Sequence, residues 1–199
     1  MVPQSNFFDR RASDWEKVHY PLRVRKRLEA LVKEFGIRPG ERVMDVGTGT
    51  GVLIPYLFRE VGASGRIFAV DLSFQMLRQA NRKPRRATDI IVQGDVHFLP
   101  FANEIVDRVI CFAAFPHFTD KAKALKEMSR VLTYDGILII AHLLSREELA
   151  KHHRAHPDVA RDTLPDSRQM RSLFVEAGLF PVEIVNKPGK YLARAKKEA

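Results

Sequence analysis

Short runs of β-branched and other apolar residues alternate along the chain with longer stretches in which apolar residues recur every three or four positions. The runs that we expect to form strands are residues 42–45, 66–70, 89–93, 106–112 and 136–141. The intervening stretches with helical spacing are residues 52–61, 73–82, 119–132 and 166–177. This alternation predicts a parallel sheet that is covered by helices on both faces.

Both ends of the chain add elements to this pattern. Residues 22–35 carry apolar side chains on one side and predict a helix before the first strand. Near the C-terminus, two strand-like segments at 181–186 and 190–195 are joined by Lys187-Pro-Gly189, which predicts an antiparallel hairpin. We therefore expect one α/β domain over residues 1–199, with a mostly parallel seven-stranded sheet.

Local signals predict where some elements begin. Ser73 is placed to cap the helix over residues 73–82. Ser145-Arg-Glu-Glu148 has the spacing of a capping box at the start of another helix. Tyr134-Asp-Gly136 predicts a turn that leads into the strand over residues 136–141.

The composition of the chain is that of a folded globular domain. The 199 residues are 45% hydrophobic and 29% charged, which argues against a disordered chain. No apolar run approaches the roughly 18 residues of a membrane span, and residues 1–6 lack the pattern of a secretory signal. The single cysteine, Cys111, cannot form an intrachain disulfide, and we expect it to pack inside the fourth strand. These features predict a cytoplasmic protein.

The formal net charge of +9 comes partly from three basic clusters, at residues 23–27, 82–86 and 194–197. Such clusters occur as solvated surface, and they also occur as binding surfaces for nucleic acid or for an anionic substrate. Charge alone does not assign a partner.

The most informative stretch is a glycine-rich loop that follows the first predicted strand. Residues 42–51 read Arg-Val-Met-Asp-Val-Gly-Thr-Gly-Thr-Gly, and a helical pattern begins directly after them. Glycines allow the backbone to turn tightly and to approach a ligand closely, and the N-terminus of a helix favours an anionic group. The third glycine, Gly51, comes one residue too early for a dinucleotide fingerprint, and no Gly-Lys-Ser/Thr of a P-loop follows.

An aspartate stands at or just after the end of each of the first three predicted strands. Asp45 lies two residues before the first glycine of the loop, Asp71 ends the second strand, and Asp95 follows the third. The position of Asp71, twenty residues after Gly51, is one from which an acid binds both ribose hydroxyls. The three acids and the loop together indicate an adenosine-type ligand.

With these residues the chain resembles the class I S-adenosylmethionine-dependent methyltransferases, and within them the small type 11 group that includes quinone-biosynthesis C-methyltransferases. The motifs that carry the resemblance are Val43-Met-Asp-Val-Gly-Thr-Gly-Thr-Gly51, Val70-Asp-Leu-Ser73, Gly94-Asp-Val96 with Leu99-Pro-Phe101, and Arg130-Val-Leu-Thr-Tyr-Asp-Gly136. The resemblance covers about residues 20–185. It implies a single Rossmann-like, doubly wound fold and S-adenosyl-L-methionine as cofactor.

The resemblance also implies roles for particular residues on the methionine side of that cofactor. Gly47, Thr48, Gly49 and Gly51 would wrap its methionine and ribose portion, and Asp45 would lie near its amino group.

On the adenosine side, Asp71 would hold the ribose hydroxyls, and Leu72 and Met76 would flank the adenine. Asp95 would meet the adenine amino group, and Val96 would meet the ring. Phe112, at the end of the fourth strand, would lie near the sulfonium.

Methyl transfer requires alignment of the acceptor and, for some acceptors, a base. His117 and His142 follow the fourth and fifth strands, and we expect them to act in catalysis or substrate binding. A hydrogen-bonded structural role is the alternative for each. A third group of histidines lies in residues 145–165, a segment that we expect to cover the site as a lid; its members are His152, His153 and His156. One further hypothesis is a divalent metal held by His117, His142 and His153.

The predicted function is methyl transfer to a small molecule. The aromatic segment over residues 1–20, expected to act as a flap, and the aromatics after the fourth strand indicate an apolar or planar acceptor, although these side chains could equally be core. Two alternatives remain open: a nucleic-acid methyltransferase, prompted by the basic clusters, and a catalytically inactive cofactor-binding subunit. The fourth strand leads into Cys111-Phe-Ala-Ala-Phe-Pro116 rather than the Asn/Asp-Pro-Pro-aromatic run of methyltransferases that modify base amino groups. The sequence predicts neither the acceptor atom nor the oligomeric state.

Overall fold

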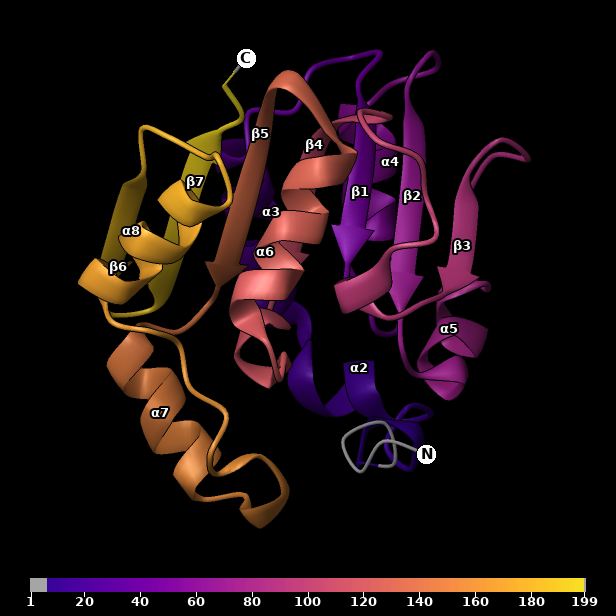
Figure 1. The fold of residues 1–199 in the computed structure, drawn as a ribbon. Helices are drawn as coiled ribbons and strands as arrows, with labels where there is room; N and C mark the ends of the chain where they lie inside the picture. Colours follow the sequence, from indigo (N-terminus) through magenta and orange to yellow (C-terminus); the bar gives the residue numbers. More distant parts are fainter. Residues whose placement is uncertain (1–6, 199) are drawn as a thin grey trace.

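The computed structural model describes residues 7–198, and its centre is a seven-stranded sheet (Figure 1). The strands are β1 (Arg42–Val46), β2 (Arg66–Asp71), β3 (Ile90–Gln93), β4 (Val106–Phe112), β5 (Leu132–His142), β6 (Glu183–Lys187) and β7 (Lys190–Lys196). They lie in the order β3-β2-β1-β4-β5-β7-β6. Strands β1 to β5 are parallel, and β7 runs antiparallel between β5 and β6. The predicted doubly wound sheet with an antiparallel C-terminal hairpin is confirmed.

Helices cover both faces of this sheet. The α-helices are α2 (Trp15–His19), α3 (Leu22–Glu34), α4 (Ile54–Glu60), α5 (Phe74–Ala80), α6 (Lys121–Val131), α7 (Arg146–Arg154) and α8 (Ser167–Glu176). Three short 3-10 helices are η1 (Val96–Phe98), η2 (Phe115–His117) and η3 (Pro157–Val159). In Figure 1, α6 and α8 lie in front of the sheet and α3 and α4 lie behind it. Within residues 7–198, no helix combines the length and the apolar character needed to cross a membrane.

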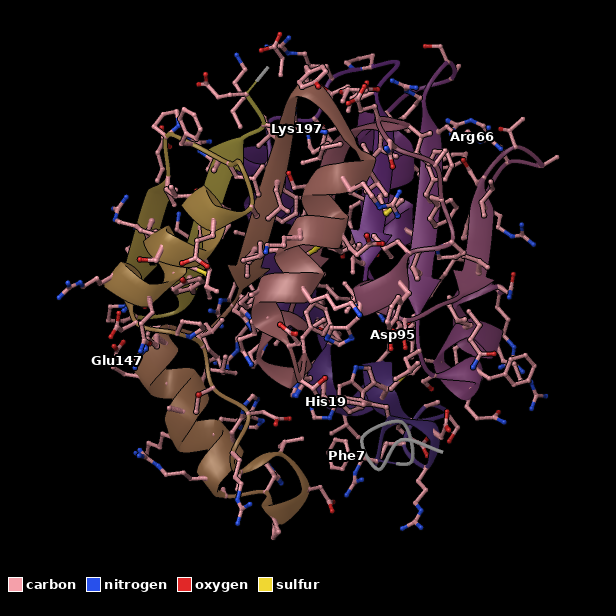
Figure 2. All side chains as sticks on the ribbon, in the orientation of Figure 1. Phe7, His19, Arg66, Asp95, Glu147 and Lys197 are labelled. Atoms are coloured by element: carbon pink, nitrogen blue, oxygen red, sulfur yellow. The ribbon has the colours of Figure 1, made fainter. Side chains whose placement is uncertain are left out.

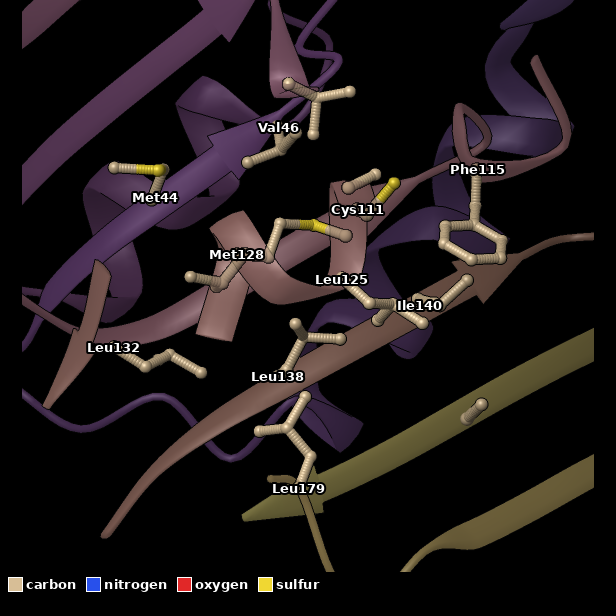
Figure 3. Packing of buried hydrophobic residues seen from close by; sticks show 14 of the residues in the cluster. Met44, Val46, Cys111, Phe115, Leu125, Met128, Leu132, Leu138, Ile140 and Leu179 are labelled. Carbon is tan, nitrogen blue, oxygen red and sulfur yellow. The ribbon is translucent and has the colours of Figure 1, made fainter. Parts of the chain in front are cut away.

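The core consists of two layers, one on each face of the sheet, because successive residues of a strand point to opposite sides. In β4, Val109 and Cys111 pack on the α6 face, which Figure 3 shows, whereas Ile110 and Phe112 pack on the α3 face. Parallel strands buried on both faces read as continuous apolar runs, as this strand does. Cys111 is buried as predicted, and burial raises the pKa of its thiol.

The expected helix caps are present. Ser73 accepts a hydrogen bond from the backbone N–H of Met76, and Ser145 forms a reciprocal capping box with Glu148. The turn expected at residues 134–136 is wrong, because β5 begins at Leu132 and continues through these residues. They form a bulge instead, in which the register with β4 shifts and Asp135 takes a φ of 66°.

The five parallel strands, β1 to β5, finish at one edge of the sheet, and segments from both halves of the chain cover that edge. In Figure 1, α2 and α5 lie beyond the arrowheads of β1 and β2, and α7 extends from the end of β5. In Figure 2, Asp95, His19 and Phe7 lie at this edge, whereas Arg66 and Lys197 lie at the opposite one. The described part of the expected flap therefore lies over the carboxyl edge. Residues 1–6 lie outside the described residues. The prediction that they lack a secretory signal, and their share of the predicted flap, stay predictions.

The N-terminal segment is bound to its surroundings by polar contacts. Asp9 accepts a 2.5 Å hydrogen bond from the hydroxyl of Ser73, at the start of α5. Glu16 pairs with Lys83 at 2.5 Å. Arg11 lies 3.6 Å from Asp158, which belongs to η3 in the segment after α7. These contacts connect the flap, α5 and the lid segment over one edge of the sheet.

Candidate active site

A pocket of about 220 Å³ opens at the carboxyl edge of the sheet, between the strand ends and the N-terminal segment. All but one of the residues expected to bind the cofactor line it; they are Asp45, Gly47, Thr48, Gly49, Asp71, Leu72, Met76, Asp95, Val96 and Phe112. His117 lines it as well. The position is the one that ligands occupy in open α/β sheets, outside the carboxyl ends of the strands.

Gly51 is the exception among the expected cofactor residues. A Cβ atom at Gly51 would lie 2.8 Å from Ile54 and 3.0 Å from Ala80, which belong to α4 and α5. Its φ of 73° also favours glycine. Gly51 therefore allows close packing of α4 against α5 and does not line the pocket.

Gly47 and Gly49 form the turn at the base of the pocket. Both have left-handed backbone angles, with φ of 70° and 56°. A Cβ atom at Gly47 would overlap the side chain of Ala114, whereas one at Gly49 would meet no atom within 4 Å. Gly47 thus brings the loop against the segment after β4, and Gly49 borders open space.

Asp45 is the most deeply buried carboxylate of the pocket, with 1% of its surface exposed. Thr48 donates a 2.6 Å hydrogen bond to its Oδ2. Oδ1 has no hydrogen-bond partner within residues 7–198. Burial, with the nearby charge of Asp71, raises the pKa of Asp45 to about 7. A cationic ligand group would offset the cost of ionising this carboxylate, so the residue fits the amino group of S-adenosylmethionine.

Asp71 is held by the same loop. Gly49 N–H donates to its Oδ2 at 2.7 Å, and Ser73 N–H donates to its Oδ1 at 2.8 Å. Burial raises its pKa, and these two hydrogen bonds oppose that rise. A carboxylate accepts up to about four hydrogen bonds, so both oxygens keep capacity for a pair of ligand hydroxyls.

Asp95 is fixed by a histidine that sequence reasoning did not single out. Asp120 N–H donates to His97 Nε2 at 3.2 Å, which places the ring proton on Nδ1. His97 Nδ1 and the His97 backbone N–H then both donate to Asp95 Oδ1, at 2.5 Å and 2.9 Å. The second carboxylate oxygen of Asp95 is left for a ligand donor such as the adenine amino group.

Aromatic rings also line the pocket, among the cofactor residues. Phe8 and Trp15 meet edge to face with their centroids 5.6 Å apart, and the rings of Tyr20 and Phe112 lie 6.3 Å apart. These four residues and Phe118 all line the pocket. The site therefore offers apolar faces from both the N-terminal segment and the end of β4.

His117 lies beside one of these rings. Its Nδ1 lies 2.7 Å from Oδ2 of Asp162, a residue between η3 and α8. The ring also meets Phe8 edge to face at 5.1 Å. No local motif marks Asp162, because the contact joins residues 45 positions apart.

His142 lies outside the pocket. It is 3% exposed, pairs with Tyr191 across the β5–β7 ladder, and its Nε2 has no hydrogen-bond partner among the described residues. Burial, together with nearby His117 and His153, lowers its pKa to about 3. Alternation along β5 places this side chain on the face of the sheet that carries Leu138 and Ile140, near His117 and His153.

The three-histidine metal site expected from the sequence is wrong. The ring centroids of His117 and His153 lie 5.2 Å apart, but Asp162 occupies one nitrogen of each ring. Nδ1 of His117 contacts the side chain of Asp162, and Nδ1 of His153 contacts its backbone carbonyl. His142 is enclosed against Tyr191. In the part of the chain that the structure describes, no three His, Cys, Asp or Glu side chains are grouped to hold a metal ion.

Comparison with known proteins agrees with this geometry. Residues 44–140 match the methyltransferase domain family, so the match covers the glycine loop, the three acids and strand β4. The chain is 37% identical over 112 residues to the ubiquinone/menaquinone biosynthesis C-methyltransferase of Vibrio vulnificus, covering 53% of this chain and 42% of that one. It is 30% identical over 169 residues to a demethylmenaquinone methyltransferase of Staphylococcus aureus, covering 84% and 61%.

A solved structure shares the whole fold. A S-adenosylmethionine-dependent methyltransferase of Aquifex aeolicus superimposes with a TM-score of 0.75 at 24% identity, over 94% of this chain and 98% of that one. The chain spans 42% and 61% of the length of these two curated relatives. The matched domain, the shared fold and the pocket agree: residues 44–140 carry a methyltransferase domain, in a chain with the fold of the S-adenosylmethionine-dependent methyltransferases.

Proposed function

We propose that this chain transfers the methyl group of S-adenosylmethionine to a small, planar acceptor. The observation that carries the proposal is that two chemical kinds of residue line one pocket. Its polar part is the buried carboxylate of Asp45 with the glycine loop, and its aromatic part is a set of rings, of which Phe8 contacts His117.

The polar part matches the functional groups of the cofactor. Asp45 would bind its amino group, Asp71 its ribose hydroxyls, and Asp95 with Val96 its adenine. When bound, the cofactor supplies an electrophilic methyl group on a sulfonium. The protein would contribute alignment and exclusion of water, which are the main contributions expected for such a displacement.

The aromatic part supports a planar acceptor. Phe8 and Trp15 come from the N-terminal segment and Phe112 from β4, so a flat ring in the pocket would contact aromatic side chains from two separate segments. His117 would accept a proton from the acceptor. The Vibrio vulnificus relative is a C-methyltransferase of ubiquinone and menaquinone biosynthesis, and its name agrees with a planar acceptor for this chain.

The basic clusters support a small-molecule acceptor over nucleic acid, because several of their members are engaged within the protein. In the first, Arg25 pairs with Glu16 at 2.9 Å. In the last, Arg194 pairs with Glu183 at 2.6 Å. Arg27, also in the first cluster, donates to the carbonyls of Leu143 and Gly189. In the second cluster, Lys83 pairs with Glu16, and Arg86 pairs with Asp89. These contacts give the clusters a structural role in holding α2, α3 and the hairpin.

The proposal is tested by methyl transfer from S-adenosylmethionine with a radiolabelled methyl group. The acceptors compared are a hydroxylated naphthalene, a catechol and total tRNA. We expect label on a small planar acceptor with the wild-type protein and a loss of roughly 100-fold with His117→Gln. Glu176→Gln, an exposed change in α8 and outside the pocket, is the control. Label on tRNA alone, or equal transfer by His117→Gln, would contradict the proposal.

A further inference from the structure

A carboxylate from the lid segment touches the histidine of the aromatic pocket. Asp162 lies between η3 and α8, and its Oδ2 is 2.7 Å from Nδ1 of His117. Both side chains are largely removed from water, with 15% of His117 and 14% of Asp162 exposed. The contact therefore joins the loop after β4 to the lid at the edge of the pocket.

The protonation of the imidazole follows from this contact. An ionised carboxylate only accepts hydrogen bonds, so Nδ1 of His117 carries the proton that it donates to Asp162. The partner of one ring nitrogen fixes the role of the other. Nε2 is then a proton acceptor when the ring is neutral, and it has no hydrogen-bond partner within residues 7–198. Because His117 lines the pocket, this acceptor is available to a bound molecule.

Both partners are held in place by further contacts. On the His117 side, Lys121 donates to the carbonyls of Pro116 and Phe118, which fixes the loop on either side of the histidine. On the other side, the backbone carbonyl of Asp162 lies 2.5 Å from Nδ1 of His153. This contact holds Asp162 against α7 within the lid, so the position of Asp162 does not depend on its contact with His117 alone.

We propose that Asp162 is a positioning residue, which holds His117 as the Nδ1–H tautomer and leaves Nε2 to accept a proton from the methyl acceptor. This inference rests on the proposed function for its role in the reaction. The acceptor's bond to hydrogen breaks and its proton goes to Nε2, giving an imidazolium beside the Asp162 carboxylate. The electron pair that remains on the acceptor forms the bond to the methyl carbon, and the pair of the broken sulfur–carbon bond stays on sulfur. The imidazolium then releases the proton to water.

The site is complete only when residues 145–165 are seated on the pocket, because the positioning carboxylate comes from that segment. Arg146, at the start of α7, donates to the carbonyl of Leu164 at 3.1 Å and so closes the loop that carries Asp162. A base assembled in this way would be active only under a closed lid, where water is excluded.

The test is nitrogen NMR of protein labelled at histidine, at about pH 8, with the His117 signals assigned by their loss in His117→Asn. In the wild-type protein we expect His117 to show a protonated Nδ1 and an unprotonated Nε2. Asp162→Ala should shift the ring toward protonation at Nε2, and the control Glu176→Ala, at an exposed position in α8, should not. A wild-type His117 protonated at Nε2, or an unchanged ring in Asp162→Ala, would overturn the inference. The wild-type spectrum tests the tautomer even if the variant does not fold.

A second measurement separates this inference from the proposed function. We expect Asp162→Ala to bind S-adenosylhomocysteine within about twofold of the wild-type affinity while methyl transfer falls roughly 100-fold. If the wild-type protein does not bind S-adenosylhomocysteine, the proposed function is wrong, and the NMR spectrum still tests the tautomer of His117. Full methyl transfer by Asp162→Ala would overturn the positioning role alone.

Discussion

Thr48 donates a 2.6 Å hydrogen bond to Oδ2 of Asp45 across the glycine loop, and this contact fixes a carboxylate that is almost wholly buried. Burying a charge costs free energy unless a partner compensates for it. One hydroxyl compensates only in part, since burial still raises the pKa of Asp45 to about 7. The ligand-free protein therefore keeps a site that is electrostatically unfavourable until a cation enters it.

The first prediction concerns the stability of the ligand-free protein. Because the pKa of Asp45 is raised to about 7, from about 3.9 in an unfolded chain, the folded protein binds this proton more tightly. The stability due to this proton is present below about pH 4 and is lost as the pH rises to about 7. We expect Asp45→Asn to raise the free energy of unfolding at about pH 8, on the order of 1–3 kcal/mol, and to change it little at about pH 4.

Urea denaturation at the two pH values measures this effect, with Glu176→Gln as the exposed control. A variant that is less stable than the wild type at about pH 8 would show that the carboxylate is already compensated.

The second prediction concerns the left-handed turn of the loop. Gly47→Ala combines an unfavourable φ of 70° with overlap against Ala114. At Gly36, φ is 63° but an added Cβ meets no atom within 4 Å. We expect Gly36→Ala to cost about 1–2 kcal/mol of unfolding free energy, and Gly47→Ala to cost more and to abolish cofactor binding. Equal losses in the two variants would show that contact with Ala114 is unimportant.

The third prediction uses the one tryptophan of the chain. Trp15 lines the pocket and is in contact with Phe8 and His19. Addition of S-adenosylhomocysteine should therefore change tryptophan fluorescence in a saturable manner, because the ligand alters the polarity around the ring. Trp15→Phe should lose the signal and keep the binding heat. Calorimetric binding without any fluorescence change would place the ligand away from the N-terminal segment.

The fourth prediction separates the two histidines that the sequence singled out. The pKa of His142 is lowered to about 3, whereas an unfolded histidine titrates near 6.5. The unfolded chain binds the extra proton, so the protein loses stability as the pH falls from about 6.5 toward 3. We expect His142→Leu to be at least as stable as the wild type at about pH 8, and to gain about 2 kcal/mol relative to it at about pH 5.

Thermal unfolding at both pH values tests this, with the exposed His156→Leu as the control. Cofactor binding should be unchanged in His142→Leu. Strong destabilisation of that variant at both pH values would indicate that Nε2 of His142 has an essential partner.

Much of the fold and of the cofactor side follows from the sequence, because it depends on local order along the chain. The strand at residues 106–112 was predicted with its observed bounds, since an apolar run between polar turns specifies a buried strand. Asp45, Asp71 and Asp95 come to one pocket because parallel strands present their carboxyl ends at the same edge.

The acceptor side depends on contacts between distant segments, and these leave little local signal. The pairing of His117 with Asp162 requires the path of the lid, and the burial of His142 requires β7 to pair with β5. Gly51 looks like a third loop glycine in the sequence, but it serves the packing of Ile54 against Ala80. The bulge around Asp135 likewise reflects the register between β4 and β5 rather than the turn-forming residues alone.

The most direct test of the account is calorimetric titration of S-adenosylhomocysteine into the wild-type protein and Asp45→Asn at about pH 8. This product retains the amino group that Asp45 would bind. We expect saturable one-site binding by the wild-type protein and an affinity about 10- to 100-fold lower in the variant, as is typical for loss of a hydrogen bond to a charged group. Equal affinities, or no binding to the wild-type protein, would contradict the assignment of this pocket to the cofactor.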